Sequence, residues 1–129
     1  MIAVDTSILI RYFVQDDPGQ AALATSLLEQ RLTPGEPGLI TVVAIAETAW
    51  VLQRVYRQSW EEVRPIIAGL LDAPNLVVEH HREVAKALAA TAGFADALIH
   101  YIGGDLGADS TFTFDKKFAR LESVELLKE

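Results

Sequence analysis

The sequence predicts an α/β fold, with a central parallel sheet of four to five strands covered on both faces by helices. Short apolar runs of strand length alternate with longer segments in which apolar residues recur at helical spacing. Helical segments separate most consecutive strands, and such crossovers join parallel strands that are buried on both faces. The 129 residues suit one compact domain spanning residues 1–129, and half of them are hydrophobic, which is enough for a core.

The first elements are a strand and two helices. Residues 2–5 are a short apolar run that ends in Asp-Thr-Ser, a strong helix-start signal, so a strand leads into a helix over about 7–14. Asp17 and Pro18 begin a second helix over about 18–31. The segment TPGEPG, residues 33–38, is the only Pro/Gly-rich loop, and it is short enough to be a connection within one domain.

The middle of the chain continues the alternation of strands and helices. A strand at 38–41 precedes a long helix that ends near residue 57. Ser59 and Glu62 form a capping box that opens a helix over about 60–72. The remaining elements are a strand at 76–79, helices over about 81–92 and 94–106, a strand at 110–114, a short helix in KKFARL and a final strand at 124–127.

Composition excludes several classes of site and of location. The chain has no cysteine, which excludes disulfides, thiolate metal sites and a cysteine nucleophile. The apolar N-terminus lacks a basic leader and contains Asp5, and no apolar run approaches the length that spans a bilayer. We therefore expect a cytoplasmic protein without a membrane partner.

The net charge is −7, from 11 basic and 18 acidic residues, whereas phosphate binding normally requires a basic surface. Bound divalent cations would reverse the local field around clustered acids. The acidic balance also predicts that a basic partner binds at an acidic face.

Two acidic residues end predicted strands. Asp5 ends the first strand, and Asp115 follows the strand at 110–114. If these two strands are neighbours, their carboxylates meet at the carboxyl end of the sheet, where parallel sheets bind ligands. Glu47 lies in the apolar segment VVAIAETAWVL, and Asp96 is the only charged residue in FADALIHYIG.

Clustering these carboxylates requires shared protons or a cation. Two unit charges about 4 Å apart repel by roughly 4 kcal/mol at an effective dielectric of 20. Oxygen ligands without His or Cys favour Mg²⁺ or Mn²⁺ over Zn²⁺. Such an ion activates water and stabilises a leaving oxygen. Hydrogen bonds from Thr6, Ser7 and Thr113 are suited to orient the carboxylates or the water.

Each acid also has a structural interpretation. Asp5 and Asp115 are placed to cap the helices that follow them. Glu47 and Asp96 are each compatible with the solvent face of an amphipathic helix. The three histidines, His80, His81 and His100, show no metal-ligand spacing with one another. We interpret the first two as a helix start and the third as a helix-surface residue.

Five segments resemble the PIN-domain ribonucleases, and specifically toxins of the VapC type. They occur in the family's order over nearly the whole chain: IAVDTSILIRYFVQDDP, ETAWVL, PNLVV, FADALI and TFDKKFARL. The resemblance implies a PIN-like three-layer α/β/α sandwich. It also implies that the four acids matching Asp5, Glu47, Asp96 and Asp115 bind Mg²⁺ or Mn²⁺ and cleave RNA through metal-activated water.

The resemblance carries further expectations about partners. Members of the family commonly form homodimers and are held inactive by a small antitoxin whose tail enters the acidic groove. Two positions depart from the family's pattern: Ser7 replaces a frequent Asn, and Gly93 replaces a frequent Asp before F-A-D. Gly93 removes a possible outer ligand, which favours one bound metal over two.

The sequence therefore predicts a metal-dependent endoribonuclease, the toxin of a type II toxin–antitoxin pair. Arg11, Lys116 and Lys117 are candidate RNA phosphate contacts, although each is also compatible with a solvated surface charge. A non-catalytic PIN-like module that binds metal and partners is the alternative. A phospho-accepting receiver domain is disfavoured, because Asp5 stands alone at the first strand.

Overall fold

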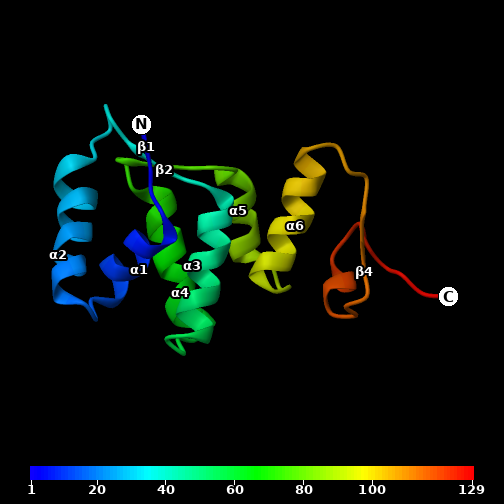
Figure 1. The fold of residues 1–129 in the computed structure, drawn as a ribbon. Helices are drawn as coiled ribbons and strands as arrows, with labels where there is room; N and C mark the ends of the chain where they lie inside the picture. Colours follow the sequence, from blue (N-terminus) through cyan, green and yellow to red (C-terminus); the bar gives the residue numbers. More distant parts are fainter. The chain divides into compact units, whose positions relative to one another are not determined.

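The computed structural model describes residues 1–129, which form two compact units, Met1–Glu79 and His80–Glu129. Each unit contains helices and parallel strands (Figure 1). None of the helices has the length and the apolar character required to cross a membrane.

The first unit contains a three-stranded parallel sheet in the order β1-β2-β3. Gly38 of β2 is paired with Ile2 of β1 and with Leu76 of β3. The elements are β1 (Ile2–Ala3), α1 (Thr6–Val14), α2 (Pro18–Ser26), the π-helical turn η1 (Leu27–Arg31), β2 (Gly38–Ile40), α3 (Val42–Arg54), α4 (Trp60–Asp72) and β3 (Leu76–Val78).

Side-chain caps fix where the helices of this unit begin. Asp5, Asp17 and Thr41 cap α1, α2 and α3, and each accepts a hydrogen bond from a backbone N–H in the first turn of its helix. The predicted capping box of Ser59 and Glu62 is confirmed at the start of α4. Helix α1 packs against both α2 and α3, and α3 packs against α4 (Figure 1). The largest fully buried side chains in this unit are Leu9, Ile40, Ile45, Leu52, Ile67, Val63 and Thr48.

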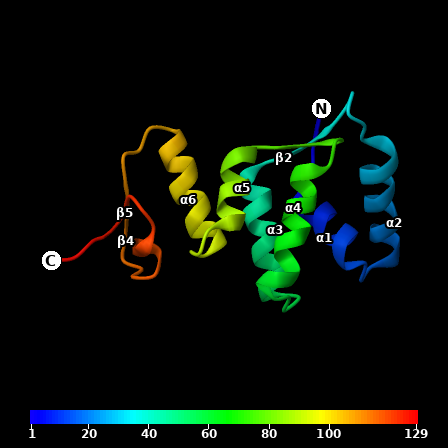
Figure 2. The same ribbon diagram turned by 180° about the vertical axis from the view of Figure 1, so that it is seen from behind.

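The second unit pairs two helices with a two-stranded parallel sheet. Helix α5 (His81–Ala89) packs against α6 (Phe94–Asp105). Strands β4 (Thr111–Thr113) and β5 (Val124–Leu126) lie side by side in parallel, joined through the short 3-10 helix η2 (Phe118–Arg120) (Figure 2).

The mixed α/β fold with parallel strands is confirmed, but the strands are short and divided between sheets of three and two strands rather than joined in one sheet. The sequence left open whether the first strand neighbours the strand at 110–114. Within the units, β1 pairs with β2, and β4 pairs with β5. The first strand also ends earlier than predicted, at Ala3, because Asp5 is already the cap of α1.

Helix ends differ from the predicted ones for local reasons. The long third helix ends at Arg54 rather than near residue 57, where Arg57 has a positive φ of 55° that a helix does not allow. The fifth helix ends at Ala89, before Gly93 caps the next helix. The predicted helix over 18–31 has the expected extent, but its last turn widens into the π-helical turn Leu27–Arg31.

Candidate active site

Asp5 caps α1 with one of its two carboxylate oxygens. Its Oδ2 accepts hydrogen bonds from the Ser7 hydroxyl at 2.6 Å and from the Ser7 backbone N–H at 3.2 Å. The hydroxyl of Ser7, followed by its backbone N–H, holds the pKa of Asp5 below its ordinary value. The side chain is exposed, and both hydrogen bonds from Ser7 end on Oδ2 and not on Oδ1. Asp5 therefore presents an ionised carboxylate with one oxygen available for a ligand.

Glu47 lies in α3 and shares a cavity of about 470 Å³ with Asp5. Because Glu47, Val51 and Val55 are spaced four residues apart, they form one stripe of α3 and its C-cap along this cavity. The opposite stripe of the helix is buried in the core, for example at Ile45 and Leu52. The amphipathic pattern of α3 thus directs Glu47 to the cavity, where its side chain is exposed.

Arg11 contributes a positive charge to the same cavity and is held in place by a hydrogen-bond network. Its guanidinium donates to Gln20 at 2.8 Å, to Asp16 at 3.0 Å and to the Tyr56 hydroxyl at 3.2 Å. Tyr56 in turn donates to Asp16 at 3.0 Å. Arg11 therefore carries a fixed charge beside the carboxylates of Asp5 and Glu47. The sequence contains no signal for this network, because Gln20 lies in α2 whereas Asp16 and Tyr56 lie in connections between helices.

Asp115 follows β4 and uses a single carboxylate oxygen to hold the turn that leads into η2. The predicted cap of a helix over KKFARL is wrong in detail, because η2 is only Phe118–Arg120 and its N-cap residue is Lys117. Its Oδ1 accepts hydrogen bonds from the backbone N–H groups of Lys117 at 2.8 Å and Phe118 at 3.1 Å. Its own N–H donates to the hydroxyl of Thr113 at 3.0 Å, which fixes the turn after the strand. The second carboxylate oxygen makes no hydrogen bond, and the neighbouring Lys116 is exposed.

Asp96 lies in the first turn of α6 and is half-buried. A helix N-terminus favours a carboxylate there, because its backbone N–H groups carry a partial positive charge. Gly93 is the N-cap of the same helix and has no side chain to cap it. A Cβ atom at Gly93 would lie 3.4 Å from the Oδ2 of Asp96, so any larger side chain at this position would start next to that carboxylate. Gly93 supplies no oxygen there.

The structure brings Asp5 and Glu47 together at one cavity of the first unit and places Asp96 and Asp115 on separate elements of the second. Holding the local backbone and binding a ligand are compatible for both residues, since Asp5 uses one oxygen to cap α1 and Asp115 uses one oxygen to hold the turn before η2. The donors are all carboxylate oxygens, a set that suits a hard divalent cation such as Mg²⁺ or Mn²⁺.

A second group of potential metal ligands was not expected from the sequence. His80, Glu83 and Asp105 offer ligand atoms that all lie within 4.8 Å of one another. The sequence contains a partial signal, because His80 and Glu83 are three residues apart at a helix start. Asp105 belongs to the next helix, and its approach depends on how α5 packs on α6.

The family model described as PIN domain matches residues 2–124, which covers both units and all four acids considered above. No curated protein matches the chain.

Proposed function

Since the chain belongs to the PIN domain family, whose members are generally metal-dependent nucleases, we propose that it is an endoribonuclease that hydrolyses phosphodiester bonds in RNA. The observation that carries the proposal is the cavity that Asp5 and Glu47 share with the fixed charge of Arg11. Carboxylates that bind a cation and a guanidinium that binds phosphate are the two components that this reaction requires.

The proposed catalytic and metal-binding residues are Asp5, Glu47, Asp96 and Asp115, and the proposed ion is Mg²⁺ or Mn²⁺. The oxygen-only donor set supports this choice of metal, as do the available oxygens of Asp5 and Asp115. When bound, such an ion lowers the pKa of a coordinated water and stabilises the leaving oxygen. The lowered pKa of Asp5 keeps that ligand ionised at neutral pH.

The other polar residues have supporting roles in this proposal. Ser7 holds one oxygen of Asp5 and so fixes the direction of the other, and buried Thr6 helps to anchor the same turn. Thr113 fixes the turn that carries Asp115. Arg11, Lys116 and Lys117 contact RNA phosphates, with Arg11 the best supported because it lines the cavity.

The proposal includes the role of toxin in a toxin–antitoxin pair, a homodimeric state and a cytoplasmic location. The net charge of −7 supports an antitoxin with a basic segment. A mainly apolar groove of about 420 Å³ in the first unit, which Tyr12, Phe13, Leu70 and Leu76 help to line, is suited to the apolar face of such a segment.

The experiment that tests the activity is cleavage of labelled structured RNAs by the purified protein with Mn²⁺ or Mg²⁺. We expect cleavage that chelation abolishes and that Asp5→Asn removes. The matched control is Glu36→Gln, which neutralises an exposed carboxylate in the 33–38 loop. Undiminished cleavage after exhaustive chelation contradicts the proposal. Mn²⁺ binding that depends on Asp5, without cleavage of any RNA, would indicate a non-catalytic metal-binding module instead.

A further inference from the structure

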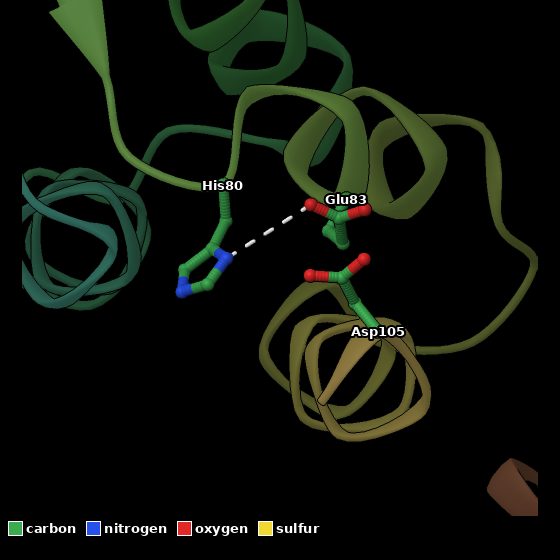
Figure 3. A group of neighbouring side chains, drawn as sticks. All are labelled: His80, Glu83 and Asp105. Carbon is green, nitrogen blue, oxygen red and sulfur yellow. Dashed lines mark ion pairs between the residues drawn. The ribbon is translucent and has the colours of Figure 1, made fainter. Parts of the chain in front are cut away.

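His80, Glu83 and Asp105 form a cluster that is separate from the four acids above and lies entirely in the second unit (Figure 3). His80 is the N-cap residue of α5, Glu83 lies in the first turn of that helix, and Asp105 is the last residue of α6. Figure 3 shows the three side chains pointing toward one another. The His80 Nδ1 and a Glu83 carboxylate oxygen are 3.9 Å apart.

Glu83 is the unusual member, because a charged side chain is buried without a hydrogen bond. The residue is only 7% exposed. Its one ionic partner is His80, at a distance too long for a hydrogen bond. Arg82 and Lys86 line the adjoining cavity, but neither forms an ion pair with Glu83, and Lys86 lies over the ring of Tyr101. A largely buried carboxylate without such partners is costly, and a bound cation would offset that cost.

Asp105 adds to the excess of negative charge at this point. The C-terminal end of a helix carries a partial negative charge, so a carboxylate there is unfavourable. The last turn of α6 contains no basic residue that compensates for it. Asp105 and Glu83 therefore lie close together, and within the cluster only the imidazole of His80 can compensate for their negative charge (Figure 3).

We propose that His80, Glu83 and Asp105 bind a transition-metal ion, of which Zn²⁺ is the best match. One imidazole nitrogen and two carboxylate oxygens are a mixed donor set that suits Zn²⁺ better than Mg²⁺. The side chain of His80 makes no capping hydrogen bond and is free to ligate. Zinc–ligand bonds of about 2.0–2.2 Å require the ligand atoms to close by about 1 Å, which the exposed Asp105 side chain can accommodate.

The bound ion links the first turn of α5 to the end of α6 and so stabilises the second unit. Asp96 lies at the opposite end of α6, so the ion also supports the helix that carries this acid. Three protein ligands leave one coordination position for water or for a ligand from solution.

Calorimetric titration of the metal-free full-length protein with Zn²⁺, together with thermal unfolding, tests the site. We expect one Zn²⁺ bound by the cluster and a rise in Tm of about 5 °C or more at saturating metal. The variants His80→Ala and Asp105→Asn should weaken this binding at least about tenfold, consistent with the loss of a ligand. His81→Ala and Asp109→Asn are matched controls that remove a neighbouring imidazole and a neighbouring carboxylate.

Two further variants separate this site from the proposed catalytic site and from a structural role. Asp5→Asn should leave the zinc-induced rise in Tm intact. Glu83→Gln should lose the rise, while the metal-free variant is at least as stable as the metal-free wild type because a buried charge is gone. Zinc binding that is unchanged in His80→Ala and Asp105→Asn, or that disappears only in Asp5→Asn, overturns the proposal.

Discussion

Two groups of carboxylates differ in how their negative charge is accommodated. One is the pair Asp5–Glu47, and the other is the cluster His80–Glu83–Asp105. Asp5 and Glu47 are exposed at an open cavity, and hydrogen bonds from Ser7 order the first of them. Glu83 is buried, and its carboxylate accepts no hydrogen bond. Exposure lets water screen the first pair while the protein fixes its geometry. In the second cluster, the burial of Glu83 makes a neighbouring cation favourable.

Exposed ligands and buried ligands are typical of two different kinds of metal site. A reactive metal site must admit water and a phosphodiester, so it needs open ligands that are oriented by their neighbours. An ion that links two helices needs no room for a phosphodiester, so its ligands can be partly buried. The following substitutions test each side of this comparison.

The largest effect is expected from the exposed pair. Asp5→Asn and Glu47→Gln should each reduce RNA cleavage by about 100-fold or more, because changes that only affect the orientation of a metal ligand already cost 10- to 100-fold. Both positions are exposed, so the fold should survive, which circular dichroism and Tm can verify. Cleavage by either variant within about threefold of wild type would remove that residue from the catalytic set.

Removing the support of Asp5 should have the next largest effect. Ser7→Ala deletes the hydroxyl that donates to Asp5 at 2.6 Å and should lower cleavage about tenfold. Because the hydrogen bonds from Ser7 lower the folded-state pKa of Asp5, their stabilisation is present above the unfolded pKa and is lost as pH falls through the folded pKa.

The stability difference between wild type and Ser7→Ala should therefore be largest at neutral pH and should shrink below about pH 4. Unfolding by urea across this pH range measures it, and NMR titration of Asp5 should show its pKa rising in the variant. Ser7→Thr is the matched control, since it keeps a hydroxyl. An Asp5 pKa that is identical in Ser7→Ala and wild type would contradict this role for Ser7.

A smaller effect is expected at the basic residues beside Asp115. Lys116→Ala should weaken RNA binding a few-fold. The slope of the logarithm of the binding constant against the logarithm of salt concentration should fall by about one unit, as expected when one phosphate contact is lost. Lys128→Ala, at the exposed C-terminal end, is the control. A salt slope that Lys116→Ala leaves unchanged would show that this lysine is only a solvated charge.

The sequence predicted the features that depend on neighbouring residues in the chain, such as helix caps and the faces of helices. The capping role of Asp5 follows from the Asp-Thr-Ser segment, and the capping box of Ser59 and Glu62 follows from their spacing. Asp115 holds the turn before η2 instead of capping the predicted helix. Glu47 was identifiable because it interrupts an apolar helix, and its position on the cavity follows from the helical repeat.

What the sequence did not predict depends on packing between elements. The pairing of β4 with β5 is decided by which strand edges meet, and no single segment encodes it. The same holds for Asp105, which joins His80 and Glu83 only through the packing of α6 on α5. The three histidines have no metal-ligand spacing with one another, and a mixed set of ligands becomes visible only when a carboxylate from α6 meets His80 and Glu83.

The smallest expected effect tests whether every buried polar group without a partner marks a ligand site. Thr48, the residue after Glu47, is fully buried, and its hydroxyl has no hydrogen-bond partner. Unlike Glu83, it carries no charge and lies among apolar residues of α3, so we assign it no ligand. Thr48→Val should therefore stabilise the protein by about 1 kcal/mol, because a similar shape replaces an unsatisfied hydroxyl. Urea unfolding measures the change, and cleavage should stay at the wild-type level. A loss of stability in Thr48→Val would show that the Thr48 hydroxyl has a hydrogen-bond partner. Thr48 and Glu83 would then no longer be two examples of an unpartnered buried group, and only their charges could be compared.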